Sequence, residues 1–556
     1  MVRVNFIIEG LSVQVEAGTT ILEAARIAGV LLESPCNAVG TCGKCKVKVA
    51  EGCLQYLIQD GTHHLSPQEE VNGFVLACQD KVMGDVDVEV IANNQNKTLK
   101  ILSHGESFAI KIDSFIKKEF DGSTKTIVYA GGKVIGEEQG DSSALNYGVV
   151  VDIGTTTLVV ALIDILSGDE LASVSSLNPQ SLQAQDVLSR IKYASDEPGL
   201  KKMYTEIIKE INRMITELLN ETGVNRKYIY EVVFSGNTCM IHLAANVDPS
   251  SLGRYPYDPK IRGGSHINAL EHGVNVSEFG VIYLPPIISA YVGPDITSGV
   301  LASRLQDQKG VTLFVDIGTN GEMVIGSNGQ LSSTSTAAGP AFEGMNITHG
   351  MRAAKGAVEL FDIQEDGSIV INTIEDAKAV GICGSGLLDI IGELVANGVI
   401  GKTGKFAAVD NDNMAPGLKE RLVKQDGKFV FAITDGVFLT QKDVRQVQLA
   451  KGAVRSGIEF LLKSKGVQAN EVDRVLIAGS FGYHLRAKSL INIGLLPEEF
   501  EGKIDFVGNT SKSGGLAFLL NVAYRQEMEE LVKEIEVVEL ANHEDFDKVF
   551  VACLGF

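Results

Sequence analysis

The N-terminal part of the chain alternates between apolar and polar positions in short runs. VRVNFIIEGLSVQVEAG predicts two strands joined by a turn at Glu9–Gly10. TTILEAARIAGV has helical spacing, and Thr20 with Glu23 forms a capping-box signature at its start. KVKVAEG and GDVDVEVIA then predict further strands. Strands, a helix, a loop and more strands indicate a small β-grasp domain over 1–92.

Longer apolar runs mark the second part of the chain, and they repeat. YGVVVDIGTTTLVVALID at 147–164 predicts an apolar strand, a tight turn and another apolar strand, and LFVDIGTNGEMVIG at 313–326 has the same pattern. A strand-and-glycine phrase follows each copy, at 230–240 and at 473–483. Copies this far apart indicate duplicated domains rather than a solenoid.

We therefore expect three parts in a mixed α/β and α+β multidomain protein. The β-grasp domain over 1–92 is followed by a polar stretch and weak patterning over 93–146, which we interpret as a linker and a small middle unit without visible chemistry. A duplicated two-lobed unit occupies 147–556, with lobe one at about 147–310 and lobe two at about 311–556.

Composition narrows the classes of function. The net charge of −21 gives a poor surface for nucleic acid or an anionic membrane, because both are bound mainly by Lys and Arg. No apolar run reaches the roughly 18 residues of a membrane-spanning helix, and the N-terminus lacks a signal-peptide layout. We expect a cytoplasmic protein that binds neither nucleic acid nor membrane. Structural disulfides are rare in that compartment, so clustered cysteines indicate metal or redox chemistry.

Four of the eight cysteines form one pattern, C-x5-C-x2-C followed by a fourth: Cys36, Cys42, Cys45 and Cys78. Thiolates ligate iron well, and a [2Fe–2S] cluster takes four of them. The alternative is a structural zinc site, but such sites usually carry two C-x2–4-C knuckles, and only Cys42 and Cys45 make one. The pattern therefore predicts an electron-carrying [2Fe–2S] domain. Cys53, eight residues past Cys45, is interpreted as a partly buried packing cysteine, and the alternative is a spare cluster ligand.

Each copy of the repeat places an aspartate at a strand end, Asp152 in the first and Asp316 in the second. In such a hairpin, backbone N–H groups and hydroxyls can hold phosphate oxygens, and the aspartate can hold Mg²⁺ directly or through water. Two of these hairpins facing each other would clamp a nucleoside triphosphate. The candidate nucleotide-binding residues of the hairpins are Gly154, Thr155, Thr156, Thr157, Gly318, Thr319, Asn320, Gly321 and Glu322.

Further glycine phrases extend the candidate site. They contribute Gly236, Asn237 and Thr238 (GNT), Gly384, Ser385 and Gly386 (GICGSG, opening a helix), and Gly479, Ser480 and Gly482 (GSFG). Glu343, in GPAFEGMNITHGMRA, is a candidate to position the attacking water; the alternative is that this loop only closes the domain interface. GNTSKSGG at 508–515 lacks the G-x4-G-K-S/T pattern and is therefore not a P-loop.

These phrases resemble the motifs of the acetate/sugar kinase, heat-shock chaperone and actin superfamily. The stretches 149–164 and 313–326 resemble its two phosphate motifs, Ser235–Thr238 its connecting motif, and Val475–Gly482 its adenosine motif. The resemblance implies a duplicated ribonuclease-H-like, actin-like ATPase fold with ATP and Mg²⁺ as ligands. The cysteine loop is similar to that of adrenodoxin-like and activator-type [2Fe–2S] ferredoxins, which use the same x5 spacing.

Both halves together resemble one family, the reductive activators of corrinoid proteins in anaerobes. The resemblance rests on the four cysteines and on VDIGTTT, SGNTCM, VDIGTNGE, GPAFEG, GICGSGLLD and AGSFG, and covers nearly the whole chain. It implies that the ferredoxin domain donates one electron to a Co(II) corrinoid protein, restoring Co(I), while ATP makes the uphill transfer feasible. The implied partners are a corrinoid iron–sulfur protein or a methyltransferase corrinoid subunit, and an upstream electron donor; formation of a homodimer stays open.

Three other functions remain open from the sequence. A metabolite kinase fused to a ferredoxin would share the phosphate motifs but would give the cluster no role. A nucleotide-dependent scaffold with a structural cluster would turn over ATP slowly, whether or not a partner is present. An activator of another low-potential enzyme, such as a dehydratase, would usually carry a cluster that bridges two subunits.

Overall fold

A computed structural model describes the protein over residues 1–556 apart from short segments at 8–10, 29, 31–44, 51–56, 59–64, 66–68, 70–71, 91–98, 104–105, 185, 365–366, 409–413, 426 and 480–484. The chain divides into two compact units, Met1–Lys97 and Thr98–Phe556. Among the described residues, no helix combines the length and the apolar composition needed to cross a bilayer.

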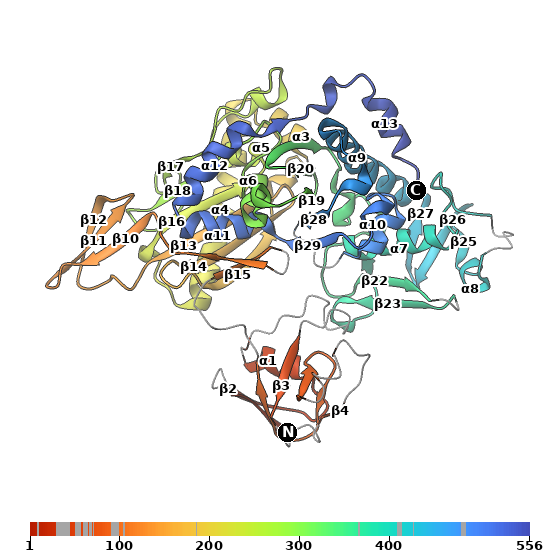
Figure 1. The fold of residues 1–556 in the computed structure, drawn as a ribbon, viewed down its shortest axis with the longest axis horizontal. Helices are drawn as coiled ribbons and strands as arrows, with labels where there is room; N and C mark the ends of the chain where they lie inside the picture. The colour runs from red at the N-terminus through yellow and green to blue at the C-terminus, as the bar shows by residue number, and fades with distance from the viewer. Residues whose placement is uncertain are drawn as a thin grey trace. The chain divides into compact units, whose positions relative to one another are not determined.

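The first unit is built on a five-stranded sheet in the order β2-β1-β7-β3-β5 (Figure 1). The strands are β1 (Val2–Phe6), β2 (Leu11–Val15), β3 (Lys46–Val49), β5 (Phe74–Leu76) and β7 (Val86–Glu89), beside a small pair of β4 (Leu57–Ile58) and β6 (Lys81–Val82). β1 pairs antiparallel with β2 and parallel with β7. Helix α1 (Ile21–Ala28) buries Ile21 and Leu22 in one core with Val4, Phe6 and Val88. The predicted β-grasp architecture is confirmed.

The second unit begins with small antiparallel elements. A hairpin of β8 (Leu99–Ser103) and β9 (Glu106–Ile110) precedes the sheet β10-β11-β12, which covers Ile116–Phe120, Lys125–Ala130 and Lys133–Gln139 and forms an arm at one edge of the unit (Figure 1). The buried amine of Lys118 donates to Glu138 at 2.8 Å and to the Tyr230 hydroxyl at 2.7 Å. The arm is therefore docked on the strand that carries Tyr230.

Two six-stranded sheets share one order over five of their strands and differ in the edge at which the sixth strand lies. The first is β15-β14-β13-β16-β18-β17, formed by β13 (Tyr147–Ile153), β14 (Thr157–Asp164), β15 (Glu170–Leu177), β16 (Ile229–Gly236), β17 (Ser265–Asn268) and β18 (Val281–Leu284). The second is β29-β28-β19-β20-β21-β30, formed by β19 (Val311–Ile317), β20 (Gly321–Ser327), β21 (Gln330–Thr336), β28 (Arg474–Ala478), β29 (Ile504–Gly508) and β30 (Glu536–Val537). Each has an antiparallel meander followed by parallel strands, which confirms the predicted duplication.

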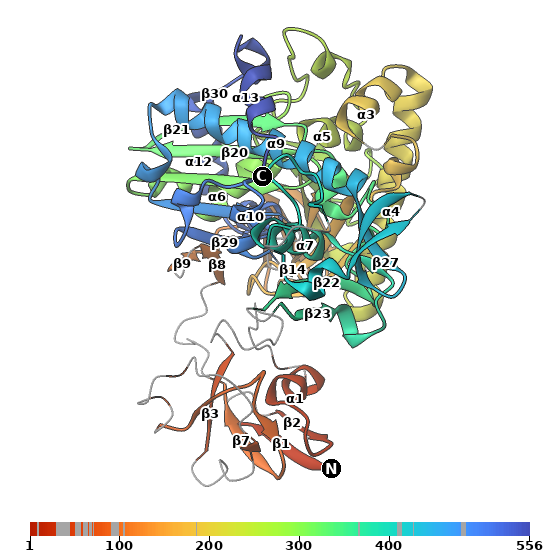
Figure 2. The ribbon, with the colours of Figure 1, turned by 90° about the vertical axis from the view of Figure 1, so that its right-hand side faces the viewer.

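Helices cover both sheets. The first sheet carries α3 (Val187–Tyr193), α4 (Glu197–Thr222) and α5 (Thr238–Ala244). Near the second lie α7 (Gly384–Ala396), α8 (Pro416–Lys419), α9 (Gln441–Lys465), α10 (Ala487–Asn492) and α13 (Phe546–Ala552), with α9 against β20 and β21 (Figure 2). A capping box starts α9, because Thr440 N donates to Asp443 Oδ2 at 2.8 Å and Asp443 N to Thr440 Oγ1 at 3.2 Å.

Smaller sheets complete the second lobe. One is β23-β22-β24, covering Ile369–Thr373, Ala357–Ile363 and Gly381–Ile382. The other is β25-β26-β27, covering Leu422–Gln425, Lys428–Thr434 and Val437–Thr440. Both join the large hydrophobic core built around β19 and α9.

Helices α6 (Pro294–Ser303) and α11 (Thr510–Leu520) lie against each other and share a core with residues of both large sheets. A methyl group added at Gly514 would lie 2.1 Å from the carbonyl oxygen of Ser298, so the two helices approach as closely as their backbones allow. The next helix, α12 (Ala523–Glu534), reaches the first sheet, where Arg525 forms an ion pair with Glu231 at 2.9 Å. The C-terminal helices α11 and α12 therefore complete the first lobe as well.

Candidate functional site

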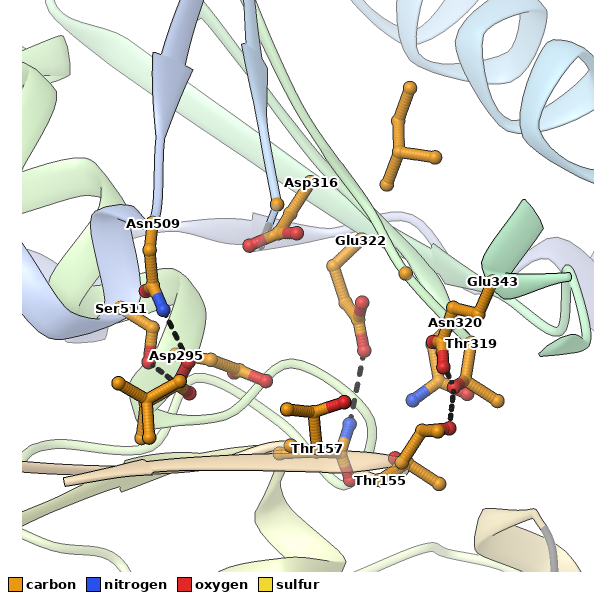
Figure 3. A pocket seen from close by; sticks show the side chains of 18 residues that line it. Thr155, Thr157, Asp295, Asp316, Thr319, Asn320, Glu322, Glu343, Asn509 and Ser511 are labelled. Atoms are coloured by element: carbon orange, nitrogen blue, oxygen red, sulfur yellow. Dashed lines mark hydrogen bonds between the residues drawn. The ribbon is translucent and has the colours of Figure 1, made fainter. Parts of the chain in front are cut away.

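The β13–β14 and β19–β20 hairpins meet at a pocket between the two large sheets (Figure 3). Most of the predicted nucleotide-binding residues line it: Asp152, Gly154, Thr155, Thr156, Thr157, Asn237, Asp316, Gly318, Thr319, Asn320, Glu322, Glu343 and Gly479. The two halves of the internal repeat thus face each other.

Asp152 accepts hydrogen bonds from the start of α11, a segment that the sequence analysis did not assign to the site. Its Oδ2 accepts from Asn509 Nδ2 and its Oδ1 from Ser511 Oγ, both at 2.8 Å (Figure 3). Asn509 caps α11, and Ser511 lies in its first turn. The phrase at 508–515 is not a P-loop, yet it belongs to the site. A signal was present, because Gly-Asn-Thr occurs at 236–238 and again at 508–510.

Asp295, in the first turn of α6, is a second residue that the sequence analysis missed. Its carboxylate is partly buried near Asp152, and burial together with the charge of that neighbour raises its pKa to about 7. Burial, followed by the charges of Asp295 and Asp152, raises the pKa of Asp316 to about 8. Because burial disfavours the charged forms of these carboxyl groups, a bound cation would stabilise them as anions.

Glu322 adds a further acid, whose pKa burial raises well above its usual range. Asn237 Nδ2 donates to its Oε1 at 3.1 Å. No Lys or Arg is among the lining residues in the described part of the chain. This donor set fits a divalent cation with oxygen ligands. Within the described ranges, no three His, Cys, Asp or Glu side chains form a group that could hold a metal ion by themselves.

Thr319 links the hairpins to Glu343. Its hydroxyl lies 2.9 Å from the hydroxyl of Thr156 and donates to Glu343 Oε1 at 2.6 Å. The other carboxylate oxygen of Glu343 is buried and has no hydrogen-bond partner in the described structure. Glu343 therefore presents an acceptor that a water molecule can use.

Some predicted residues do not line the pocket. Gly384, Ser385 and Gly386 open the buried helix α7, where a Cβ at Gly384 would lie 1.9 Å from the Phe342 carbonyl oxygen and one at Gly386 2.0 Å from that of Val358. Their small size is required by packing. Other predicted residues outside the lining are Gly236, Thr238 and Gly321. Ser480 and Gly482 lie outside the described residues.

Two of the four predicted cluster cysteines are described, and they lie together in the first unit. The Sγ atoms of Cys45 and Cys78 are 3.1 Å apart, and both side chains are buried. This distance is longer than the ~2.05 Å of a disulfide, so the two sulfurs are thiols available as ligands. Cys36 and Cys42 lie outside the described residues.

A β-grasp domain with converging thiols, in one chain with a two-lobed unit whose Asp-Gly-Thr hairpins face each other, defines a ferredoxin-fused protein of the actin-like ATPase class. Three family models match successive parts of the chain, from the ferredoxin-like domain to the two-lobed unit. They are a 2Fe-2S iron-sulfur cluster binding domain over 6–83, the RACo middle region over 147–308, and the C-terminal domain of RACo, the ASKHA domain, over 310–556.

The chain is 30% identical over 555 residues to the corrinoid activation enzyme RamQ of Eubacterium limosum, with 93% of each chain covered. It is 24% identical over 444 residues to a Co(II) methylated amine-specific corrinoid protein reductase of Methanosarcina barkeri, covering 74% of this chain and 77% of that one. A solved reductive activator for corrinoid, iron–sulfur protein aligns with a TM-score of 0.76 and 30% identity over 100% of this chain and 98% of the other. The chain belongs to the family of reductive activators of corrinoid proteins.

Proposed function

We propose that this protein is an ATP-dependent reductive activator. A [2Fe–2S] domain over 1–92, reduced by an upstream donor, passes one electron to a Co(II) corrinoid protein, which returns to Co(I). The two-lobed unit over 147–556 hydrolyses ATP to drive this transfer. The observation that carries the proposal is the presence in one chain of the converging thiols and of a carboxylate-lined pocket between two phosphate-type hairpins. A ferredoxin-fused kinase would leave the thiols without a role.

In the nucleotide pocket, Asp152, Asp295 and Asp316 hold Mg²⁺ and its waters, because carboxylate oxygens are the ligands that this ion prefers. The hydroxyls and N–H groups of Thr155–Thr157 and Thr319 bind phosphate oxygens. Glu343 positions the attacking water through its unpartnered oxygen. The proposed roles follow from the pocket lining and from the hydrogen bonds already described.

The proposed transfer is uphill, because plant-type [2Fe–2S] clusters have potentials of about −400 mV and Co(I) is a stronger reductant than most clusters, so ATP has to contribute free energy. A one-electron step of about 59 mV corresponds to about 1.4 kcal/mol. A coupling free energy of about 1–3 kcal/mol between two sites therefore covers only about 40–130 mV. We infer that nucleotide binding closes the two lobes on the complex with the corrinoid protein, and that hydrolysis resets it.

Anaerobic visible spectroscopy tests the proposal. The reduced, cluster-loaded protein is mixed with a Co(II) corrinoid protein, with and without Mg-ATP. Growth of a Co(I) band only with ATP is the expected result, and Asp316→Asn should abolish that band while leaving the cluster spectrum intact. If no corrinoid protein yields Co(I) despite an intact cluster, the acceptor is a different low-potential enzyme or the two-lobed unit is a kinase.

A further inference from the structure

Arg190 places a completely buried guanidinium directly behind the first phosphate hairpin. It lies on α3 and is 0% exposed. Its Nη2 donates to the carbonyl oxygen of Thr155 at 2.5 Å and its Nε to that of Ala184 at 3.0 Å, while Nη1 meets Gln180 Oε1 at 3.2 Å and the Met240 sulfur at 2.9 Å. All four acceptors are uncharged.

A buried charge without an ionic partner is costly, so most buried arginines form an ion pair with a carboxylate. Arg525 of this chain follows that rule, because it is nearly as buried and is paired with Glu231 at 2.9 Å. Burial lowers the pKa of Arg190 only to about 10, so the guanidinium keeps its charge at neutral pH. No carboxylate accepts a hydrogen bond from Arg190, although the charges of Asp186 and Glu343 lie near enough to help keep its pKa high.

The hairpin loop is oriented by contacts on the same side as Arg190. Asn178 Nδ2 donates to the Gly154 carbonyl at 2.8 Å, and the backbone N–H of Asn178 donates to the Thr156 carbonyl at 2.9 Å. Together with the hydrogen bond from Arg190 to the Thr155 carbonyl, these contacts engage three successive carbonyl groups of the loop on the side away from the pocket. In a trans peptide the N–H points opposite to the preceding carbonyl, so the N–H groups of Thr155 and Thr156 are turned towards the pocket. Such an array binds anions.

The pocket in front of this loop is rich in acids. Five carboxylates line it, and no Lys or Arg is among its described lining residues. A polyphosphate entering the pocket meets these carboxylates, and it is repelled by whatever negative charge they keep and Mg²⁺ does not neutralise. Arg190, one peptide group behind the loop in a low-dielectric interior, is the cation whose field opposes it.

We propose that Arg190 is the positioning residue for the polyphosphate chain of ATP, orienting the N–H groups of the 154–156 loop and supplying the positive charge that the pocket lining lacks. The proposal rests on the ATP-binding role of this pocket. Its effect grows with the charge of the nucleotide, being largest for ATP, smaller for ADP and near zero for adenosine. A purely structural arginine would change the affinities for all three equally.

The test is calorimetric binding of ATP, ADP and adenosine to the cluster-loaded, full-length protein. Arg190→Gln removes the charge, Arg190→Lys keeps it and loses the fork geometry, and Arg525→Gln removes a buried arginine outside the pocket lining. We expect Arg190→Gln to weaken ATP binding about tenfold or more and adenosine binding by less than about twofold, with Arg190→Lys between the parent and Arg190→Gln. Arg525→Gln should bind ATP as the parent does.

An equal loss for ATP and adenosine, or no loss for ATP, would overturn the role of Arg190. If the parent protein itself bound no ATP, the proposed ATP-dependent function would be wrong. That outcome differs from a failure of the Arg190 proposal, in which the parent binds ATP and Arg190→Gln shows no selective loss. Circular dichroism and the cluster spectrum establish that each variant is folded. Should Arg190→Gln not fold, the ATP-to-adenosine affinity ratio of Arg190→Lys decides: an unchanged ratio overturns the proposal, and a reduced ratio supports it.

Discussion

The hydroxyl oxygens of Thr156 and Thr319 lie 2.9 Å apart, one on each phosphate hairpin. The proton of Thr319 is already donated to Glu343 Oε1 at 2.6 Å, so Thr156 must donate to Thr319. The nucleotide-free protein therefore contains a directed hydrogen-bonded chain from the first lobe, through the second hairpin, to the proposed water-positioning carboxylate.

Replacing Thr319 with Val breaks this chain at its centre. Glu343 then loses the hydroxyl that orients it, and a hydrogen bond to a charged group is worth about 1.5–3 kcal/mol. We expect kcat for ATP hydrolysis to fall about tenfold or more, measured by steady-state phosphate release. Thr312→Val is the matched control, because Thr312 is fully buried on β19, the strand that leads into the turn of Thr319, and its hydroxyl has no hydrogen-bond partner in the described structure. Equal activities of the two variants would contradict the role of Thr319.

The raised pKa of Asp316 makes stability depend on pH. This carboxyl has a pKa of about 8 in the folded protein, against about 3.9 in an unfolded chain. Between these values the folded state binds a proton that the unfolded state has released, so stability falls as pH rises through the window. Asp316→Asn removes the titrating group and should therefore lose less stability than the parent between about pH 6 and about pH 8.

Thermal unfolding of the nucleotide-free protein at several pH values measures this effect. Asp435→Asn, in an exposed turn of the second lobe, is the control and should follow the parent. A pH slope for Asp316→Asn that matches the parent's would show that Asp316 is ionised in the folded protein across this range.

Asp295 should prove essential for ATP hydrolysis, although no motif singled it out. Asp295→Asn keeps the size of the side chain but removes a charge that we assign to the Mg²⁺ site, so we expect a loss of about 100-fold in kcat with the nucleotide still bound. Single-turnover hydrolysis combined with ATP binding separates the two effects. Asp307→Asn, on an exposed aspartate beyond the other end of α6, should retain full activity. Normal ATP turnover by Asp295→Asn would show that the assignment of Asp295 to the Mg²⁺ site is wrong.

The two functional units should separate cleanly by mutation. Cys78→Ser replaces a thiol with a poor ligand for iron, so the [2Fe–2S] absorption and Co(I) formation should be lost while ATP hydrolysis persists. Visible and electron paramagnetic resonance spectra of anaerobically purified protein test this. Cys553→Ser, at a partly exposed position in the second lobe, should keep the cluster spectrum. A complete cluster in Cys78→Ser would assign the fourth ligand elsewhere.

The phosphate hairpins were predictable because their signal is local. An apolar strand, an aspartate at its end and a Gly-Thr turn specify a hairpin within about ten residues, and the repeat of this phrase at Asp152 and Asp316 makes it specific. The capping box of α9 was predictable for the same reason, since Thr440 and Asp443 are three residues apart.

Asp295, Asn509 and Ser511 could not be found this way. They lie at the N-termini of α6 and α11, and they reach the pocket only because these two helices cross between the sheets. A local glycine pattern can also have a packing explanation. GICGSG looks like a phosphate turn, but the absence of a side chain at Gly384 is explained by the carbonyl of Phe342, 1.9 Å from where a Cβ would be.

The place of α11 in the fold constrains how the protein is made. Phe518 and Leu519 share a core with Val150 and Val233 of the first large sheet. As the chain leaves the ribosome, that sheet is complete long before Thr510–Leu520 has been synthesised, and its apolar face stays open until then. A message truncated ahead of residue 510 would yield a first lobe with this face uncovered, prone to aggregation and to capture by chaperones. We therefore expect a fragment of the first lobe that ends at its own last strand to be poorly soluble unless Thr510–Leu520 is supplied with it.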